Sequence, residues 1–149
     1  MGDRTTVTLT ILENQDMEAL GHFSYTPSES WADGTHCVHE FHDVNYGTLD
    51  FLPKLKAAGI AYNAAWERGN EYGPGTKSLR FDPSGDPIEK EIYDSEQSID
   101  VFDLLQLIDK PEELRHLIVS THEQVTTLPW DNQELYGRRY RAKQLITTK

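Results

Sequence analysis

The spacing of apolar residues changes near residue 98, and this change limits the fold more than any other feature of the chain. Before it, apolar and polar residues alternate, as at residues 5–12 (TTVTLTIL) and 88–93 (IEKEIY), which predicts strands with one buried face. After it, apolar residues recur three or four positions apart, which predicts helices. A chain of 149 residues is long enough to form one domain with its own core. We therefore expect a single α+β domain over residues 1–149.

The remaining elements follow from the same patterns and from turn residues. A short helix is expected at 16–20, within a stretch at 13–34 that otherwise has the composition of a surface loop. Further strands are expected at 35–46, at 60–66 and from 79 onward, and further helices at 51–58, 98–109 and 111–124. We expect a mainly antiparallel sheet of four or five strands, with the 51–58 helix and the two later helices packed on one face.

Charge is distributed very unevenly along the chain. The net charge is −11, yet residues 1–137 carry nine Lys and Arg against 25 carboxylates, for a net charge of −16. Such a body repels polyanions, because nucleic-acid binding depends on cations that neutralise phosphates. The composition therefore points away from a nucleic-acid groove in the body and toward a basic partner.

The acidic stretch between Asp82 and Asp103 is the strongest candidate for a partner-binding surface. Lys90 is the only cation within it, so its net charge is −7. A surface of this kind suits a basic protein and can imitate a nucleic-acid backbone, although a charge run can also be a solvated face that keeps a domain in solution. The candidate residues are Asp82, Asp86, Glu89, Glu91, Asp94, Glu96, Asp100 and Asp103.

The C-terminal segment 137–149 is basic. It interleaves arginine and tyrosine, as in RRYRAK, and this mixture can contact phosphates and stack on bases. The acidic body weakens that reading, so we expect the segment to fold back on its own chain or on a neighbouring copy in a homodimer. The pattern does not decide between a strand and a helix after Gly137.

A histidine-rich strand provides the best metal candidate. His36, His39, Glu40 and His42 lie within HCVHEFHD, and these residue types bind divalent metals such as zinc. Their spacing matches no zinc signature, and side chains on one strand point nearly parallel rather than toward one ion. A metal-binding domain or metal-dependent enzyme centred on this strand is therefore an alternative function, with solvated or hydrogen-bonded histidines as the simpler interpretation.

A glycine-rich loop at 69–76 provides the third candidate site. The loop contains or is flanked by Trp66, Arg68 and Tyr72. This combination of aromatic and charged side chains predicts a small-ligand site between the loop and the sheet. The loop lacks the GxxxxGK[ST] and GxGxxG patterns of phosphate-binding loops, and a strand rather than a helix is expected to follow it. A wide hairpin loop is the simpler interpretation.

These observations favour a non-enzymatic accessory or inhibitory protein over an enzyme. The chain contains no GxSxG or HExxH motif, and its acidic pairs are too numerous to assign acid–base catalysis. We expect no cofactor, apart from a divalent metal under the alternative function. The single cysteine, Cys37, fits a reducing compartment, and no segment approaches eighteen apolar residues, so we expect a cytoplasmic protein without a membrane span.

Overall fold

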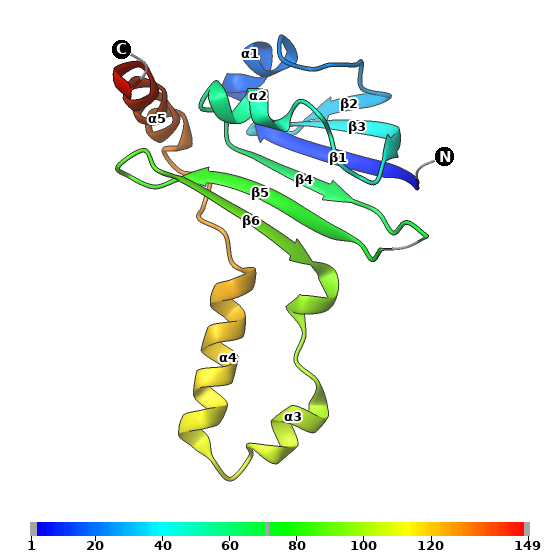
Figure 1. Ribbon diagram of the computed structural model, residues 1–149, viewed down its shortest axis with the longest axis vertical. Helices are drawn as coiled ribbons and strands as arrows, with labels where there is room; N and C mark the ends of the chain where they lie inside the picture. Colours follow the sequence, from blue (N-terminus) through cyan, green and yellow to red (C-terminus); the bar gives the residue numbers. More distant parts are fainter. Residues whose placement is uncertain (1–2, 71, 148–149) are drawn as a thin grey trace.

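The computed structural model describes residues 3–70 and 72–147 and shows an α+β fold built on one antiparallel sheet (Figure 1). The sheet has six strands in the order β2-β3-β1-β4-β5-β6. The strands are β1 (Arg4–Leu12), β2 (Glu29–Ala32), β3 (His36–Asn45), β4 (Tyr62–Trp66), β5 (Gly75–Phe81) and β6 (Pro87–Tyr93). The α+β class and the antiparallel sheet are confirmed. The expected four or five strands become six because β2 forms inside the segment 13–34, which was expected to be mainly loop.

The sheet has two unlike faces because its central strand alternates strictly. In β1, Val7, Leu9 and Ile11 are completely buried, whereas the threonines between them are partly exposed. The antiparallel registers place Val7 beside Phe41 on one side and Trp66 on the other, so the apolar residues of three strands share one face. The core lies on this face.

Three helices cover the core face (Figure 1). They are α1 (Asp16–Leu20), which follows the short 3-10 helix η1 (Glu13–Gln15), α2 (Leu52–Ala57) and α5 (Gln133–Thr147). α2 begins with proline in its first turn and ends before Gly59, whose φ of +73° suits the residue after a helix C-terminus. The helix expected at 51–58 is therefore confirmed within one residue at each end.

α5 is held at the end of β5 by buried contacts. Gln133 is 1% exposed, and its side-chain amide accepts from Phe81 N at 2.7 Å and donates to Phe81 O at 3.0 Å. Tyr140 packs edge-on against the ring of Phe81, with ring centroids 5.2 Å apart. The C-terminal segment is therefore a helix that folds back on its own chain.

The other sheet face is covered partly by the chain that links α4 to α5. Arg80 is 2% exposed and donates to the carbonyls of Leu128, Tyr62 and Leu79, with its guanidinium 3.7 Å from the centre of the Trp130 ring. Burial lowers the pKa of Arg80 to about 10. This buried arginine fixes the linking segment across the sheet.

The two helices expected to pack on the sheet instead form an arm that projects from the end of β6 (Figure 1). After the 3-10 helix η2 (Asp94–Gln97), the chain enters α3 (Val101–Gln106) and returns through α4 (Pro111–Val125). Neither helix contains a buried residue, so the expected packing of these two helices on the sheet is wrong. Among the described residues, no helix combines the length and apolar character that crossing a membrane requires.

Candidate functional site

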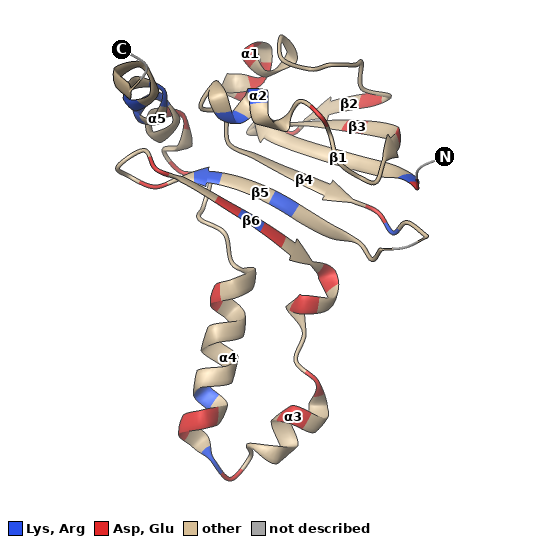
Figure 2. Cartoon of the chain, viewed as in Figure 1, with Lys and Arg blue, Asp and Glu red and all other residues tan. Residues whose placement is uncertain are grey.

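The predicted acidic residues lie along β6 and continue into the arm, but they do not form one patch. Figure 2 shows carboxylates following this edge of the sheet from the β5–β6 turn to α3. At the α5 end, Asp86 pairs with Lys143 at 3.1 Å, and Glu89 pairs with Lys56 of α2 at 3.5 Å. Asp82 accepts from Asp86 N at 2.9 Å and so stabilises the turn. These three carboxylates therefore serve the fold, and the surface available to a partner is shorter than the sequence predicts.

The other five carboxylates form an exposed row that we call the acidic strip. Its members come from the end of β6, η2 and the start of the arm: Glu91, Asp94, Glu96, Asp100 and Asp103. Within the described part of the chain, none of the five takes part in an ion pair. Asp100 also caps α3, because its side chain accepts from Phe102 N at 2.8 Å. The strip contributes five negative charges within thirteen residues and contains no cation.

Lys90 stands next to the strip but does not neutralise it. Its ammonium donates to the carbonyl of Glu123 at 2.9 Å and also to that of Thr126, at the C-terminal end of α4. A lysine in this position satisfies helix carbonyls that have no partner in the helix, and it favours the negative end of the helix dipole. The single cation of the predicted acidic stretch therefore anchors the arm.

The basic residues of α5 lie at the opposite end of the sheet (Figure 2). Arg138 pairs with Glu134 of the same helix, and Arg141 pairs with Glu18 of α1 at 3.1 Å. Arg139 donates to the carbonyl of Pro83 in the β5–β6 turn. α5 thus pairs with acids around it, whereas the five carboxylates at the arm end of β6 have no cationic partner among the described residues.

The histidine strand does not form a metal centre in the described residues, where no group of three or more His, Cys, Asp or Glu is arranged to hold an ion. His39 faces the core, and its two ring nitrogens are already used, by Ser30 Oγ at 2.7 Å and Asp16 Oδ1 at 2.6 Å. His42 and Glu40 lie 2.6 Å apart on the surface, and this hydrogen bond raises the pKa of His42.

His36, the remaining member of the predicted metal set, lies apart from His39 and His42. Its ring packs against Trp130 with centroids 5.1 Å apart, and it lies 3.5 Å from Asp33. The predicted ligands are therefore divided between a buried hydrogen-bond network and two separate surface pairs.

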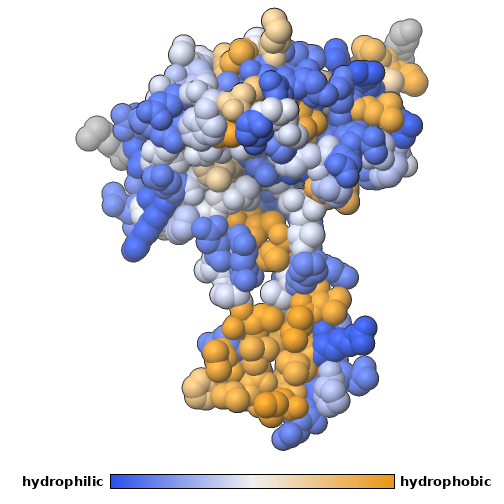
Figure 3. All heavy atoms as spheres, turned by 180° about the vertical axis from the view of Figure 1, so that it is seen from behind, coloured by the Kyte–Doolittle hydropathy of each residue, from blue (hydrophilic) through white to orange (hydrophobic). Residues whose placement is uncertain are grey.

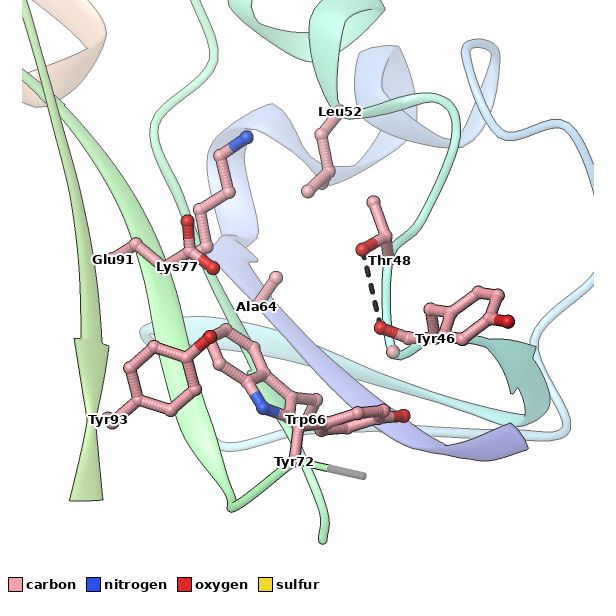
Figure 4. A pocket seen from close by; sticks show the side chains of 10 residues that line it. Tyr46, Thr48, Leu52, Ala64, Trp66, Tyr72, Lys77, Glu91 and Tyr93 are labelled. Carbon is pink, nitrogen blue, oxygen red and sulfur yellow. Dashed lines mark hydrogen bonds between the residues drawn. The ribbon is translucent and has the colours of Figure 1, made fainter. Parts of the chain in front are cut away.

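The glycine-rich loop is a wide connection in the β4–β5 hairpin, and it borders an open pocket of about 210 Å³ (Figure 4). The pocket lies over Ala64, where a small side chain leaves a hollow on the core face. Trp66 and Tyr72 line it, whereas Arg68 does not. The other lining residues are Tyr46, Gly47, Thr48, Leu52, Lys77, Glu91 and Tyr93.

The sequence interpretation missed the apolar surface of the arm. Six large apolar side chains of the arm are exposed, and the most exposed is Phe102 at 72%. Figure 3 shows a continuous hydrophobic patch over the arm on the side turned away from the viewer in Figure 1. The helical spacing after residue 98 identified these residues as apolar, but spacing cannot show what covers them. We call this set the arm face: Val101, Phe102, Leu105, Ile108, Ile118 and Val119.

Comparisons with models of protein families, with curated proteins and with solved structures find no match to this chain. The functional proposal therefore depends on the geometry of the acidic strip, the pocket and the arm.

Proposed function

We propose that this protein is a non-enzymatic accessory or inhibitory protein that binds a basic macromolecular partner through the acidic strip. The observation that supports the proposal is the sorting of charge: α2 and α5 pair with carboxylates at their end of β6, whereas the strip carries five exposed and unpaired ones. Long-range attraction by such a surface steers a cationic partner and selects against acidic ones.

The form of the strip also favours a partner that normally binds a polyanion. Its carboxylates follow one another along consecutive elements, from Glu91 on β6 to Asp103 on α3, and so resemble a row of phosphates more than a single charged pocket. Binding of a basic partner would release counterions from the strip, as protein binding does from a nucleic acid. The affinity should therefore fall steeply as the salt concentration increases. The proposed role is thus that of a nucleic-acid mimic.

Affinity capture from native cell extract tests this proposal. The wild type is compared with a strip variant that carries four substitutions: Glu91→Gln, Asp94→Asn, Glu96→Gln and Asp103→Asn. Asp100 is retained because it caps α3. The control variant makes the same change in net charge at exposed sites away from the strip, through Glu13→Gln, Asp50→Asn, Glu67→Gln and Asp131→Asn.

The proposal predicts that specific proteins are captured at low salt by the wild type and the control variant, and are lost with the strip variant. Capture of the same proteins by the strip variant would refute a role for these carboxylates. Loss with both variants would show that net charge alone is responsible, which also contradicts a defined site.

Small-ligand binding at the pocket over Ala64 is a second candidate function. Its support is the placement of Trp66 and Tyr72 in the pocket wall, together with Lys77 and Glu91, which form no ion pair among the described residues. Planar aromatic compounds suit such walls. Ligand-observed NMR with a panel of them, repeated on Ala64→Leu, would test it: signals that the leucine does not reduce would refute binding in this pocket.

A further inference from the structure

The arm face lacks a cover that its helices need. α3 has six residues and α4 has fifteen, and in the described chain neither contains a buried side chain. Isolated helices shorter than about 12–15 residues are marginal in water, because most helix stability in proteins comes from packing of an apolar face. A six-residue helix with Phe102 at 72% exposure therefore requires contacts that this chain does not supply to itself.

The size of the arm face is that of a protein interface. Its six side chains are between 44% and 72% exposed, which corresponds to an apolar area on the order of 700 Å² for residues of this size. The largest apolar patch on a typical monomer is about 300–600 Å², and a stable interface buries about 800 Å² on each partner. The arm face alone supplies most of one side of such an interface.

The arm face carries both a projecting side chain and a hollow that can receive one. Phe102 projects from α3, and α4 has an open hollow of about 260 Å³ on its surface. The hollow is lined by Pro111, Leu114, Arg115, Ile118 and Val119. A two-fold axis lets each copy insert its projecting group into the hollow of the other, as in knobs-into-holes packing.

We propose that the arm face is covered by the arm face of a second copy of this chain, so that α3 and α4 of two copies form a four-helix interface. The interface leaves the acidic strip accessible: Asp103 lies on the opposite side of α3 from Leu105 by helical spacing, Asp100 immediately precedes α3, and the other three strip residues precede the arm. A dimer therefore presents two strips. This inference goes beyond the proposed function and does not depend on it.

Charge makes the dimer distinguishable from partner binding. Residues 98–126 carry six carboxylates, namely Asp100, Asp103, Asp109, Glu112, Glu113 and Glu123, against Lys110 and Arg115, so each arm has a net charge of −4. Two arms repel each other electrostatically while their apolar faces attract. Salt screens the repulsion and strengthens apolar association. The dimer should therefore become more stable as salt rises, whereas a complex at the acidic strip becomes weaker.

Sedimentation equilibrium of the full-length protein at 10 μM, in 50 mM and 500 mM NaCl, tests the dimer. The wild type should have twice the chain mass of 17.1 kDa, with a dissociation constant at least threefold lower at the higher salt. The arm variant Phe102→Asp, Ile118→Glu should be monomeric under the same conditions. Its matched control, Met17→Glu, Ile146→Glu, adds two charges at exposed apolar positions outside the arm and should remain dimeric.

The outcomes separate clearly. A wild-type monomer at 10 μM in both salts overturns the proposal, even if another protein binds the arm face. A dimer that survives the arm substitutions, or that the control abolishes, places the interface elsewhere and also overturns it. Far-UV circular dichroism checks folding of the arm variant; if it is unfolded, the milder Leu105→Ser replaces it and should raise the dissociation constant at least tenfold. Failure of the dimer leaves the strip variants of the capture experiment unaffected.

Discussion

At the scale of single residues, a close backbone contact between α5 and the loop after α2 leaves no space for a side chain. Gly137 of α5 lies against Gly59 after α2, and a Cβ built on Gly137 would stand only 1.9 Å from the carbonyl oxygen of Gly59. No pattern in the sequence indicated that Gly137 lies inside a helix, in contact with the loop after α2. Local patterns report the conformation of a residue, whereas this constraint comes from a neighbour 78 positions away in the chain.

Gly137→Ala should therefore destabilise the protein although alanine favours helices. The propensity gain is about 1 kcal/mol, but the new methyl group must displace the backbone of Gly59, so we expect a net loss of about 2 kcal/mol or more in the free energy of unfolding. Urea denaturation measures the change. Gly73→Ala is the control, because its Cβ meets nothing within 4 Å and should change stability by less than about 0.5 kcal/mol. Equal stability of Gly137→Ala and the wild type would contradict the close contact.

Cys37 should be an unreactive thiol at neutral pH. Burial raises the pKa of this thiol, and the nearby Asp16 carboxylate raises it further. The thiolate is the form that reacts, and a raised pKa lowers the fraction of thiolate at any pH below that pKa. Alkylation by iodoacetamide at pH 8 should therefore be slower than for a free cysteine derivative, and it should accelerate as the pH passes 9. Denaturant should restore the ordinary rate. Fast alkylation of the folded protein at pH 8 would show that Cys37 is exposed as thiolate.

At the scale of elements, most boundaries were predictable, and the exceptions have physical reasons. The alternation of β1 and the Pro and Gly signals around α2 are local, so the sequence located both elements well. β2 was missed because ESWA lies among Ser, Pro, Asp and Gly residues that are typical of loops, and it is a strand only through pairing with β3. The burial of α3 and α4 was predicted wrongly because an apolar stripe does not reveal what covers it.

The attachment of the arm depends on one lysine of the edge strand. Lys90→Met removes the charged group that binds the carbonyls of Glu123 and Thr126, so the last turn of α4 should open more often. Hydrogen exchange of amides in residues 121–125 should become faster by about tenfold, which corresponds to roughly 1.4 kcal/mol, with β1 unchanged. The exposed Lys54→Met is the control. Unchanged exchange in α4 would show that the lysine contributes nothing to the arm.

At the scale of the whole molecule, the sequence predicted the charge polarity but not its spatial arrangement. Arg141 and Lys143 of α5 pair with Glu18 of α1 and with Asp86 of the β5–β6 turn, which are distant in the chain. Only the fold shows that two of the eight predicted acidic residues, Asp86 and Glu89, are in ion pairs and that Asp82 and Asp100 accept backbone hydrogen bonds. The same applies to the pocket: Trp66 and Tyr72 were identified from a glycine-rich context, whereas Lys77 and Glu91 join them through the pairing of β5 with β6.

The salt dependence of binding to a captured partner is the decisive test of recognition through the acidic strip. With the partner purified, the logarithm of the dissociation constant is measured against the logarithm of salt concentration between 50 and 300 mM for the wild type, the strip variant and the control variant. The account predicts at least a tenfold weakening for the wild type and the control, and a clearly shallower slope for the strip variant. Equal slopes for all three proteins, or affinity independent of salt, would contradict recognition through the acidic strip.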